Sequence, residues 1–175
     1  FDGISRRVPM LVEYRGGYYP SLALEMARVL LGRPALRPVY PDDPDYGALE
    51  WLELARAGRP ALRIPVDEQA ASLIPYRGAQ GSFRYVSAAD VLAGRVPVDQ
   101  LNGRIVLFGT TAPGLMDLRA TPVGSTYAGV EIHANLLAGI LDQAIVQKPA
   151  YLLGAEVLLL LVCAVLLVVV LPIVS

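Results

Sequence analysis

The sequence contains only one cysteine, one histidine and one lysine, and these scarcities exclude several kinds of site. The cysteine, Cys163, lies within a long apolar run, so the rest of the chain offers no disulfide, thiolate nucleophile or cysteine-bound metal. The single histidine, His133, excludes a multi-histidine metal site, and the chain has no Gly-x-Ser-x-Gly motif of a serine hydrolase. We therefore expect no catalytic residue, no metal and no cofactor in this chain.

An excess of charge of one sign is lacking as well. Lysine and arginine together number 15 and aspartate and glutamate 16, without a basic patch or an acidic tail. Nucleic-acid-binding domains gather basic residues on one face, so a nucleic-acid partner is not expected.

Charged and strongly polar side chains are absent from Val157 to Val174, near the end of the chain. A helix of about eighteen residues is roughly 27 Å long, which is close to the hydrocarbon thickness of a bilayer. The alternative is a buried core helix, but a core helix of this length usually has a polar face. We predict one domain over residues 1–148, followed by a transmembrane helix over residues 149–175. Because the chain begins at Phe1 and stops just after the run, we interpret it as a fragment of a longer protein.

Residue periodicity predicts a mixed α/β (α+β) domain with a β-sheet and packed helices. Alternating apolar residues predict a strand over 6–14 that returns after the Arg15-Gly16-Gly17 turn, and another over 62–66 with 73–76 as its hairpin partner. The apolar run 105–108 predicts a strand buried on both faces. The remaining expectations are a short strand at 145–146 and loops at 36–45, 77–82 and 109–127.

Helical spacing and capping signals predict four helices before the apolar run. They begin at Ser21, at Ala48, at a Ser87–Asp90 capping box, and at Ala128. The side chains expected to face the core are Leu22, Met26, Val29 and Leu30 in the first helix and Val130, Ala134, Leu137, Ala138 and Leu141 in the last.

Eight short motifs follow one another between Arg6 and Asn135. They are Arg6-Arg7-Val8-Pro9, Tyr19-Pro20-Ser21-Leu22-Ala23, Ile74-Pro75-Tyr76-Arg77-Gly78, Tyr85-Val86-Ser87-Ala88-Ala89-Asp90-Val91-Leu92, Gly103-Arg104-Ile105-Val106, Gly109-Thr110-Thr111-Ala112, Asp117-Leu118-Arg119-Ala120-Thr121-Pro122-Val123-Gly124 and Gly129-Val130-Glu131-Ile132-His133-Ala134-Asn135. No single motif is diagnostic, but the ordered set resembles the CHASE2 family, the extracytoplasmic sensor domain of bacterial transmembrane receptors.

This resemblance implies a role and a location. Residues 1–148 would lie outside the inner membrane of a bacterium, and membrane helices would connect them to an adenylate or guanylate cyclase, a serine/threonine or histidine kinase, or a diguanylate cyclase. The implied partners are the lipid bilayer, a second copy of the receptor and an unidentified stimulus. The family also carries an N-terminal membrane helix and an opening stretch of domain before the part seen here.

The candidate ligand-binding residues lie on the last predicted helix and in the loop before it. Glu131 and Asn135 are four residues apart and share a helix face, and we hypothesise that this face closes over the loop Thr110–Thr121 to form a polar pocket. The alternative is that Glu131 and Asn135 cap and anchor the loop structurally. Arg119 has the fork of donors that binds an anionic group. The full candidate set is Thr110, Thr111, Asp117, Arg119, Thr121, Glu131 and Asn135.

Two other functions stay open at this point. The domain could be a membrane-anchored assembly or dimerisation module without a small ligand. It could instead be a membrane-anchored enzyme, which would need a polar cleft with a perturbed acid or base such as Asp117 or Glu131. The chain offers no convincing nucleophile for that chemistry.

Overall fold

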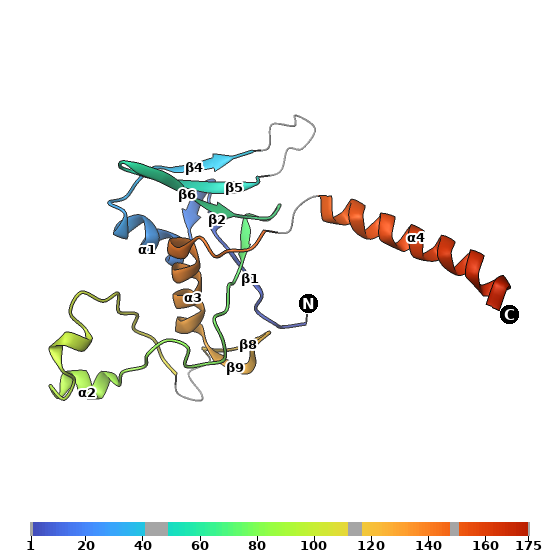
Figure 1. Ribbon diagram of the computed structural model, residues 1–175. Coiled ribbons are helices and arrows are strands. Elements are labelled where there is room, and N and C mark those ends of the chain that lie inside the picture. Colours follow the sequence, from blue (N-terminus) through green and yellow to red (C-terminus); the bar gives the residue numbers. More distant parts are fainter. Residues whose placement is uncertain (1, 41–48, 112–116, 148–150, 175) are drawn as a thin grey trace.

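The computed structural model describes residues 2–40, 49–111, 117–147 and 151–174. They form a mixed α+β domain followed by one long separate helix (Figure 1). The elements, in chain order, are β1 (Arg7–Pro9), β2 (Leu11–Tyr14), β3 (Gly17–Pro20), α1 (Leu22–Leu30), β4 (Leu36–Val39), β5 (Trp51–Arg56), β6 (Arg59–Pro65), β7 (Ala71–Leu73), α2 (Ala88–Leu92), a 3-10 turn (Val98–Gln100), β8 (Leu118–Thr121), β9 (Gly124–Ala128), α3 (Gly129–Asp142) and α4 (Tyr151–Val174).

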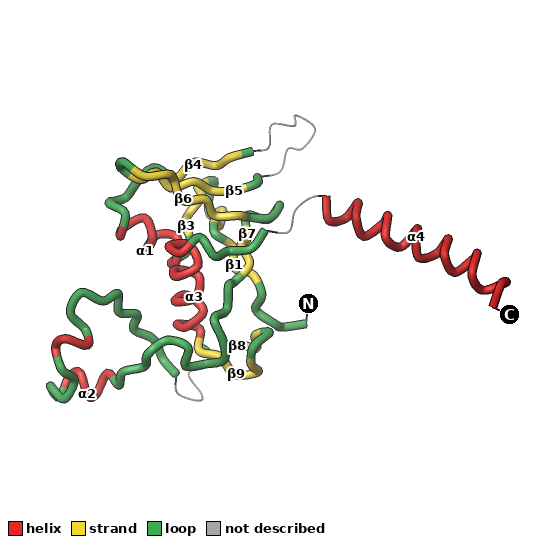
Figure 2. The backbone as a smooth tube through the Cα atoms, viewed as in Figure 1, coloured by secondary structure: helices red, strands yellow, loops and turns green. Residues whose placement is uncertain are grey.

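The described strands form four small antiparallel sheets rather than one large sheet (Figure 2). Their orders are β1-β7, β2-β3, β4-β5-β6 and β8-β9. The β2–β3 hairpin turns at Arg15-Gly16, as predicted, with Val12 opposite Tyr19. A parallel bridge between Ile4 and Ala120 lays the start of the chain against β8.

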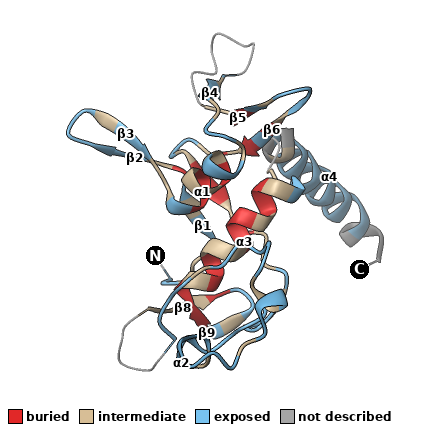
Figure 3. Cartoon of the chain, turned by 90° about the vertical axis from the view of Figure 1, so that its left-hand side faces the viewer, coloured by how far each residue is buried: buried red, intermediate tan, exposed pale blue. Residues whose placement is uncertain are grey.

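Helix α3 lies at the centre and packs against α1, β6 and β9. Its side chains Leu136 and Ile140 are fully buried and meet Leu24 of α1 and Leu62 and Ile64 of β6 in one apolar core. Figure 3 shows the buried residues concentrated in α3 and α1 and in the neighbouring strands. The core therefore fixes the position of α3 from several sides.

The predicted helix from Ser21 is confirmed, but its predicted buried face is wrong. Ser21 caps α1 by accepting a hydrogen bond from the Leu24 backbone N–H, while Leu22 and Leu30 are about half exposed. Ala23, Leu24 and Ala27 are buried instead, because small alanine side chains let α1 approach α3 closely. Of the four predicted residues only Met26 packs against the core, because the buried face is centred on smaller residues to one side of the predicted stripe.

The predicted helix at residues 128–141 is also confirmed, with a different buried face from the one expected. Leu137 is buried as predicted, but Val130, Ala134, Ala138 and Leu141 are only partly buried. The buried residues are Gly129, Glu131, Ile132, Asn135, Leu136, Leu137, Gly139 and Ile140. Two polar residues lie inward because a neighbouring segment supplies their hydrogen-bond partners, which the helical pattern of the sequence does not reveal.

Residues 51–56 form strand β5, so the predicted helix beginning at Ala48 is wrong. β5 turns at residues 57–58 and pairs with β6, which confirms the strand over 62–66 but not its predicted partner. β7 pairs with β1 instead. β4 occupies residues 36–39 of the predicted loop 36–45. Residues 41–45 of that loop lie outside the described residues. Pro38 is tolerated because β4 is an edge strand.

The short helix predicted after Ser87 is confirmed as α2, but its capping box and three other predictions between Ser87 and Val146 are wrong or only partly described. The side chain of Ser87 makes no capping bond, and Asp90 forms an ion pair with Arg95 instead. Residues 105–108 form no strand and Phe108 is 84% exposed, because no described neighbouring strand pairs with their backbone. Residues 145–146 likewise form no strand. Part of the predicted loop 109–127 is the β8–β9 hairpin, and residues 112–116 lie outside the described residues.

Helix α4 stands apart from the rest of the chain, and its residues 154–170 are exposed (Figures 1 and 3). It contains 24 residues. Among the residues that the structure describes, no helix is both long and apolar enough to cross a membrane. The predicted transmembrane helix therefore stays a prediction.

Substitution of Leu24 by Ala tests which face of α1 is buried. Leu24 is 0% exposed, so we expect Leu24→Ala to lower the free energy of unfolding by about 2–5 kcal/mol, the usual cost of removing a buried leucine side chain. Leu30→Ala is the matched control in the same helix, since Leu30 is 48% exposed, and it should cost about 0.5 kcal/mol or less. Chemical denaturation measures both, and a larger cost for Leu30→Ala would contradict the described packing.

Candidate functional site

The polar face of α3 meets the segment 77–85, which runs from β7 toward α2. Two α3 side chains on this face are buried, Glu131 with 2% exposure and Asn135 with 0%. Burial of a carboxylate or an amide is costly unless its polar atoms are hydrogen-bonded. The partners of these two groups therefore define the site.

The Glu131 carboxylate is held by hydrogen-bond donors of the 77–85 segment. The backbone N–H of Gly81 lies 3.1 Å from both carboxylate oxygens, and the backbone N–H of Phe83 donates to Oε1 at 3.3 Å. The Tyr85 hydroxyl donates to Oε2 at 2.7 Å. Within the described parts of the chain Glu131 has no ion pair, so dipoles rather than a cation stabilise its charge.

Asn135 forms a hydrogen bond with the first residue of the same segment. Its Oδ1 accepts a hydrogen bond from the Arg77 backbone N–H at 3.0 Å. Its Nδ2 donates to the Tyr127 hydroxyl at 2.9 Å and to the backbone carbonyl of Glu131 at 2.8 Å. The Tyr127 hydroxyl in turn donates to the Gly78 carbonyl at 3.5 Å. Both ends of the 77–85 segment are thus tied to α3.

Tyr76 and Tyr85 remain hydrogen-bond donors at physiological pH, because the pKa of each is raised. Burial raises the pKa of Tyr85 far above its ordinary value, and the neighbouring Glu131 raises it further. Burial, with a smaller effect of Tyr127, raises the pKa of Tyr76 to about 12. Tyr76 donates to the Ser5 carbonyl at 2.7 Å, and its ring packs edge-on against Tyr127 with centroids 5.3 Å apart.

The first turn of α3 meets Asp117, which directly precedes β8. The Gly129 backbone N–H donates to the Asp117 carbonyl at 2.8 Å. A Cβ atom at position 129 would lie 2.3 Å from Asp117 Oδ1, so any larger residue there would displace the Asp117 carboxylate. The Nδ1 atom of His133 is buried and has no hydrogen-bond partner among the described residues.

The structure separates the predicted site residues. Glu131 and Asn135 lie together, but their hydrogen-bond partners are in the 77–85 segment, β9 and α3 rather than in the Thr110–Thr121 loop, part of which lies outside the described residues. Thr110, Thr111 and Arg119 are exposed, and the buried Thr121 donates to the Gly124 carbonyl within its hairpin. Whether the seven candidate residues of the sequence analysis contact a ligand stays a prediction.

The sequence predicts a Gly-rich loop at 77–82, either a second rim of the site or a plain hairpin connection, and does not reveal that the 77–85 segment anchors α3. Gly81, Phe83 and Tyr85 bind Glu131, yet Gly81 and Phe83 do so through backbone N–H groups, which every residue type except proline possesses. The only signal in the sequence is that Glu131 and Asn135, two polar residues, are four positions apart and so share one face of the helix. It indicates that a partner exists without identifying it.

Two open hollows lie beside this segment. One, of about 500 Å³, is lined by Gln80, Gly81, Phe83, Arg84 and Tyr85. The other, of about 370 Å³, is lined by Arg84, Tyr85, Val86, Ser87, Asp90, Arg95, Val96, Pro97 and Gln100. None of the predicted ligand-binding residues is among these lining residues. No cluster of metal-ligating side chains occurs in the described ranges.

Replacement of Glu131 by Ala tests how much the anchored segment depends on this carboxylate. The change leaves the Gly81 and Phe83 N–H groups and the Tyr85 hydroxyl without their acceptor, so we expect a loss of at least about 1–3 kcal/mol in unfolding free energy. Hydrogen exchange of the Gly81 and Phe83 amides should become faster. Glu25→Ala, which removes a carboxylate paired with Arg28 on the surface of α1, is the control and should cost about 1 kcal/mol or less. Equal costs would contradict the anchoring role.

The stability of the domain should decrease as the pH falls below about 6.5. Burial lowers the pKa of His133 from its ordinary value, and the charge of Asp117 opposes this effect. In the window between the lowered pKa and the ordinary one, the unfolded chain binds the proton more readily, so falling pH favours unfolding. The slope is at most about 1.4 kcal/mol per pH unit, the value for one proton.

The variant His133→Asn isolates this effect, because the chain has no other histidine. Thermal unfolding at pH 7.5, 6.5 and 5.5 should show a smaller loss of stability in the variant than in the parent chain. Parallel losses in the two chains would show that His133 is not the group responsible.

Comparisons with known proteins now give the family. A family model described as the CHASE2 domain matches residues 1–171. Neither the curated proteins nor the solved structures gave a match. CHASE2 domains are sensory, non-catalytic domains and form the extracytoplasmic parts of membrane receptors. The match spans nearly the whole chain, which therefore belongs to the CHASE2 family.

Proposed function

We propose that this chain is the extracytoplasmic input domain of a bacterial membrane receptor, and that α4 is its membrane helix. In this proposal a stimulus changes the state of the domain, and α3 and α4 relay the change to a cytoplasmic output such as an adenylate or guanylate cyclase or a protein kinase. The observation that carries the proposal is the CHASE2 match over residues 1–171, together with the position of α3 directly before α4 in the chain.

The contacts of α3 support its role as the relay. Glu131 and Asn135, in its first half, hold the 77–85 segment. At its other end Gln143 adopts a left-handed backbone conformation and binds β6, accepting from the Arg63 N–H at 2.8 Å and donating to the Arg63 carbonyl at 3.0 Å. A shift of α3 would therefore change both the 77–85 segment and the chain that leads toward α4.

The sequence and the exposure of α4 support a membrane location. Its 24 residues correspond to roughly 36 Å of helix, enough for the hydrocarbon core of a bilayer. From Val157 to Val170 its large apolar side chains are exposed on all sides, as lipid-facing side chains would be. In the sequence the apolar run continues to Val174.

Ligand sensing in this proposal is a shift between two arrangements of the domain. A ligand can favour one arrangement only by the difference between its affinities for the two. Cyclase and kinase outputs usually act as dimers, so the proposal includes a second copy of the receptor as partner.

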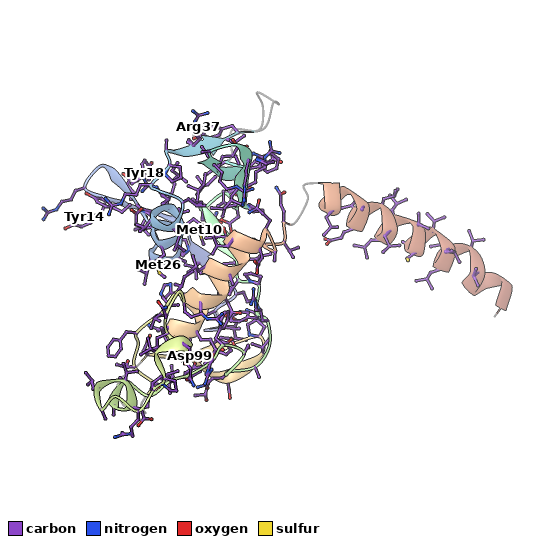
Figure 4. The ribbon with its side chains drawn as sticks, turned by 60° about the vertical axis from the view of Figure 1, so that its left-hand side comes forward. Met10, Tyr14, Tyr18, Met26, Arg37 and Asp99 are labelled. Carbon is purple, nitrogen blue, oxygen red and sulfur yellow. The ribbon has the colours of Figure 1, made fainter. Side chains whose placement is uncertain are left out.

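A membrane-anchored assembly module is a second candidate, and one surface favours it. The β2–β3 hairpin projects from the domain and exposes more than half of Val12, Tyr14, Tyr18 and Tyr19 (Figures 3 and 4). Exposed aromatic side chains gathered in one place are typical of protein-protein contacts. This candidate needs no ligand, whereas the sensor needs a site that changes α3.

Cysteine labelling of the full chain in intact bacterial cells tests the proposed topology. Ser125 of β9 is exposed, so Ser125→Cys in a Cys163→Ala background should react with a membrane-impermeant maleimide from outside the inner membrane. Cys163 of the parent chain lies in the proposed span and should react only after the membrane is dissolved in detergent. Labelling of Ser125→Cys only after cell lysis, or rapid labelling of Cys163 in intact membranes, would refute the topology.

A further inference from the structure

The two hollows beside the 77–85 segment share two lining residues, Arg84 and Tyr85. The hollows are therefore neighbours that share part of one wall. Both are open depressions of the surface rather than enclosed cavities, with volumes of about 500 and 370 Å³. A ligand bound at either one would contact Arg84.

The charge of Arg84 is not neutralised by any residue that the structure describes. Its Nη2 atom donates to the neutral amide oxygen of Gln100 at 2.8 Å, and no described carboxylate forms an ion pair with it. The other arginine of the second hollow, Arg95, is already paired with Asp90. The side chains that line each hollow therefore carry a net positive charge, while the Glu131 carboxylate is hydrogen-bonded to three of the residues that line the larger one. A guanidinium with free donors binds carboxylates through two parallel hydrogen bonds.

Aromatic side chains form much of the larger hollow. Phe83 and Tyr85 line it on either side of Arg84 in the sequence. The guanidinium of Arg77 lies 5.3 Å from the centre of the Phe83 ring and helps to fix that ring in place. Aromatic walls next to a guanidinium suit a planar ring that carries a carboxylate group.

The same residues also hold α3. Of the five residues that line the larger hollow, Gly81, Phe83 and Tyr85 each donate a hydrogen bond to the buried Glu131 carboxylate. A molecule that moves these residues must alter the hydrogen bonds of Glu131. The hollow and the helix are therefore coupled through one carboxylate.

We propose that Arg84, Phe83 and Tyr85 form a binding site for small aromatic carboxylates, and that Glu131 transmits binding there to α3. The carboxylate group binds the Arg84 guanidinium, and the ring packs on Phe83 and Tyr85. The signalling consequence rests on the proposed receptor function, whereas the binding itself does not.

Titration of the full chain in detergent micelles with benzoate, followed by nuclear magnetic resonance, tests the site. We expect the backbone amide signals of Gly81, Phe83 and Tyr85 to shift with a saturable dependence on benzoate. Arg84→Gln should weaken binding by about tenfold or more, since one charge-assisted pair is worth at least about 1.4 kcal/mol. Arg59→Gln, which changes an exposed arginine of β6, is the matched control and should leave binding unchanged.

Two further probes define the ligand class. Benzylamine has the same ring with the opposite charge and should not bind. Inorganic phosphate supplies an anion without a ring and should bind at least tenfold more weakly than benzoate, because it lacks the contact with Phe83 and Tyr85. Benzoate binding that Arg84→Gln leaves unchanged would overturn the site, and equal affinities for benzoate and phosphate would overturn its aromatic specificity.

The coupling to α3 has its own readout, the side-chain amide of Asn135, which lies one helical turn after Glu131. In the parent chain benzoate should shift this signal as well. Glu131→Gln retains the shape of the side chain and should still bind benzoate through Arg84, with a much smaller shift at Asn135. An undiminished shift would overturn the coupling.

Absence of benzoate binding would reject this site and leave the proposed topology intact, because the labelling of Ser125→Cys tests the topology independently.

Discussion

The arrangement of this domain depends on the buried carboxylate of Glu131. A charge that is 2% exposed must be stabilised, and in the described chain no cation pairs with it. Two backbone N–H groups and the Tyr85 hydroxyl do so instead. The 77–85 segment, which has no helix or strand of its own, keeps its path along α3 because Glu131 and Asn135 accept hydrogen bonds from it.

This mode of anchoring suits a sensory domain better than an apolar contact of the same size. Hydrogen bonds to a carboxylate are directional, so a small displacement of Tyr85 or Gly81 weakens them, whereas apolar contacts tolerate sliding. The opposite end of α3 is fixed to β6 through Gln143. A helix held at both ends by specific polar contacts can convert a local change at its first turns into a change in the chain beyond it.

The sequence predicted the elements that local signals specify. Ser21 begins a helix because its side chain caps α1, and the Arg15-Gly16-Gly17 turn joins β2 and β3 because glycine adopts the positive φ that Gly16 needs. The family was recognisable because its motifs recur in order along the chain. Strand pairing was not predictable in the same way, since the backbone partner of a strand is decided by contacts distant in the sequence.

The sequence by itself therefore determined the family, the α3 helix and the apolar run of α4. Only the tertiary structure decided which faces are buried, that β7 pairs with β1, and that Glu131 and Asn135 bind the 77–85 segment. The physical reason is that capping, turns and helical periodicity act over a few residues and leave a visible pattern. Hydrogen bonds to backbone N–H groups depend on position alone, so no residue type in the sequence marks where they form.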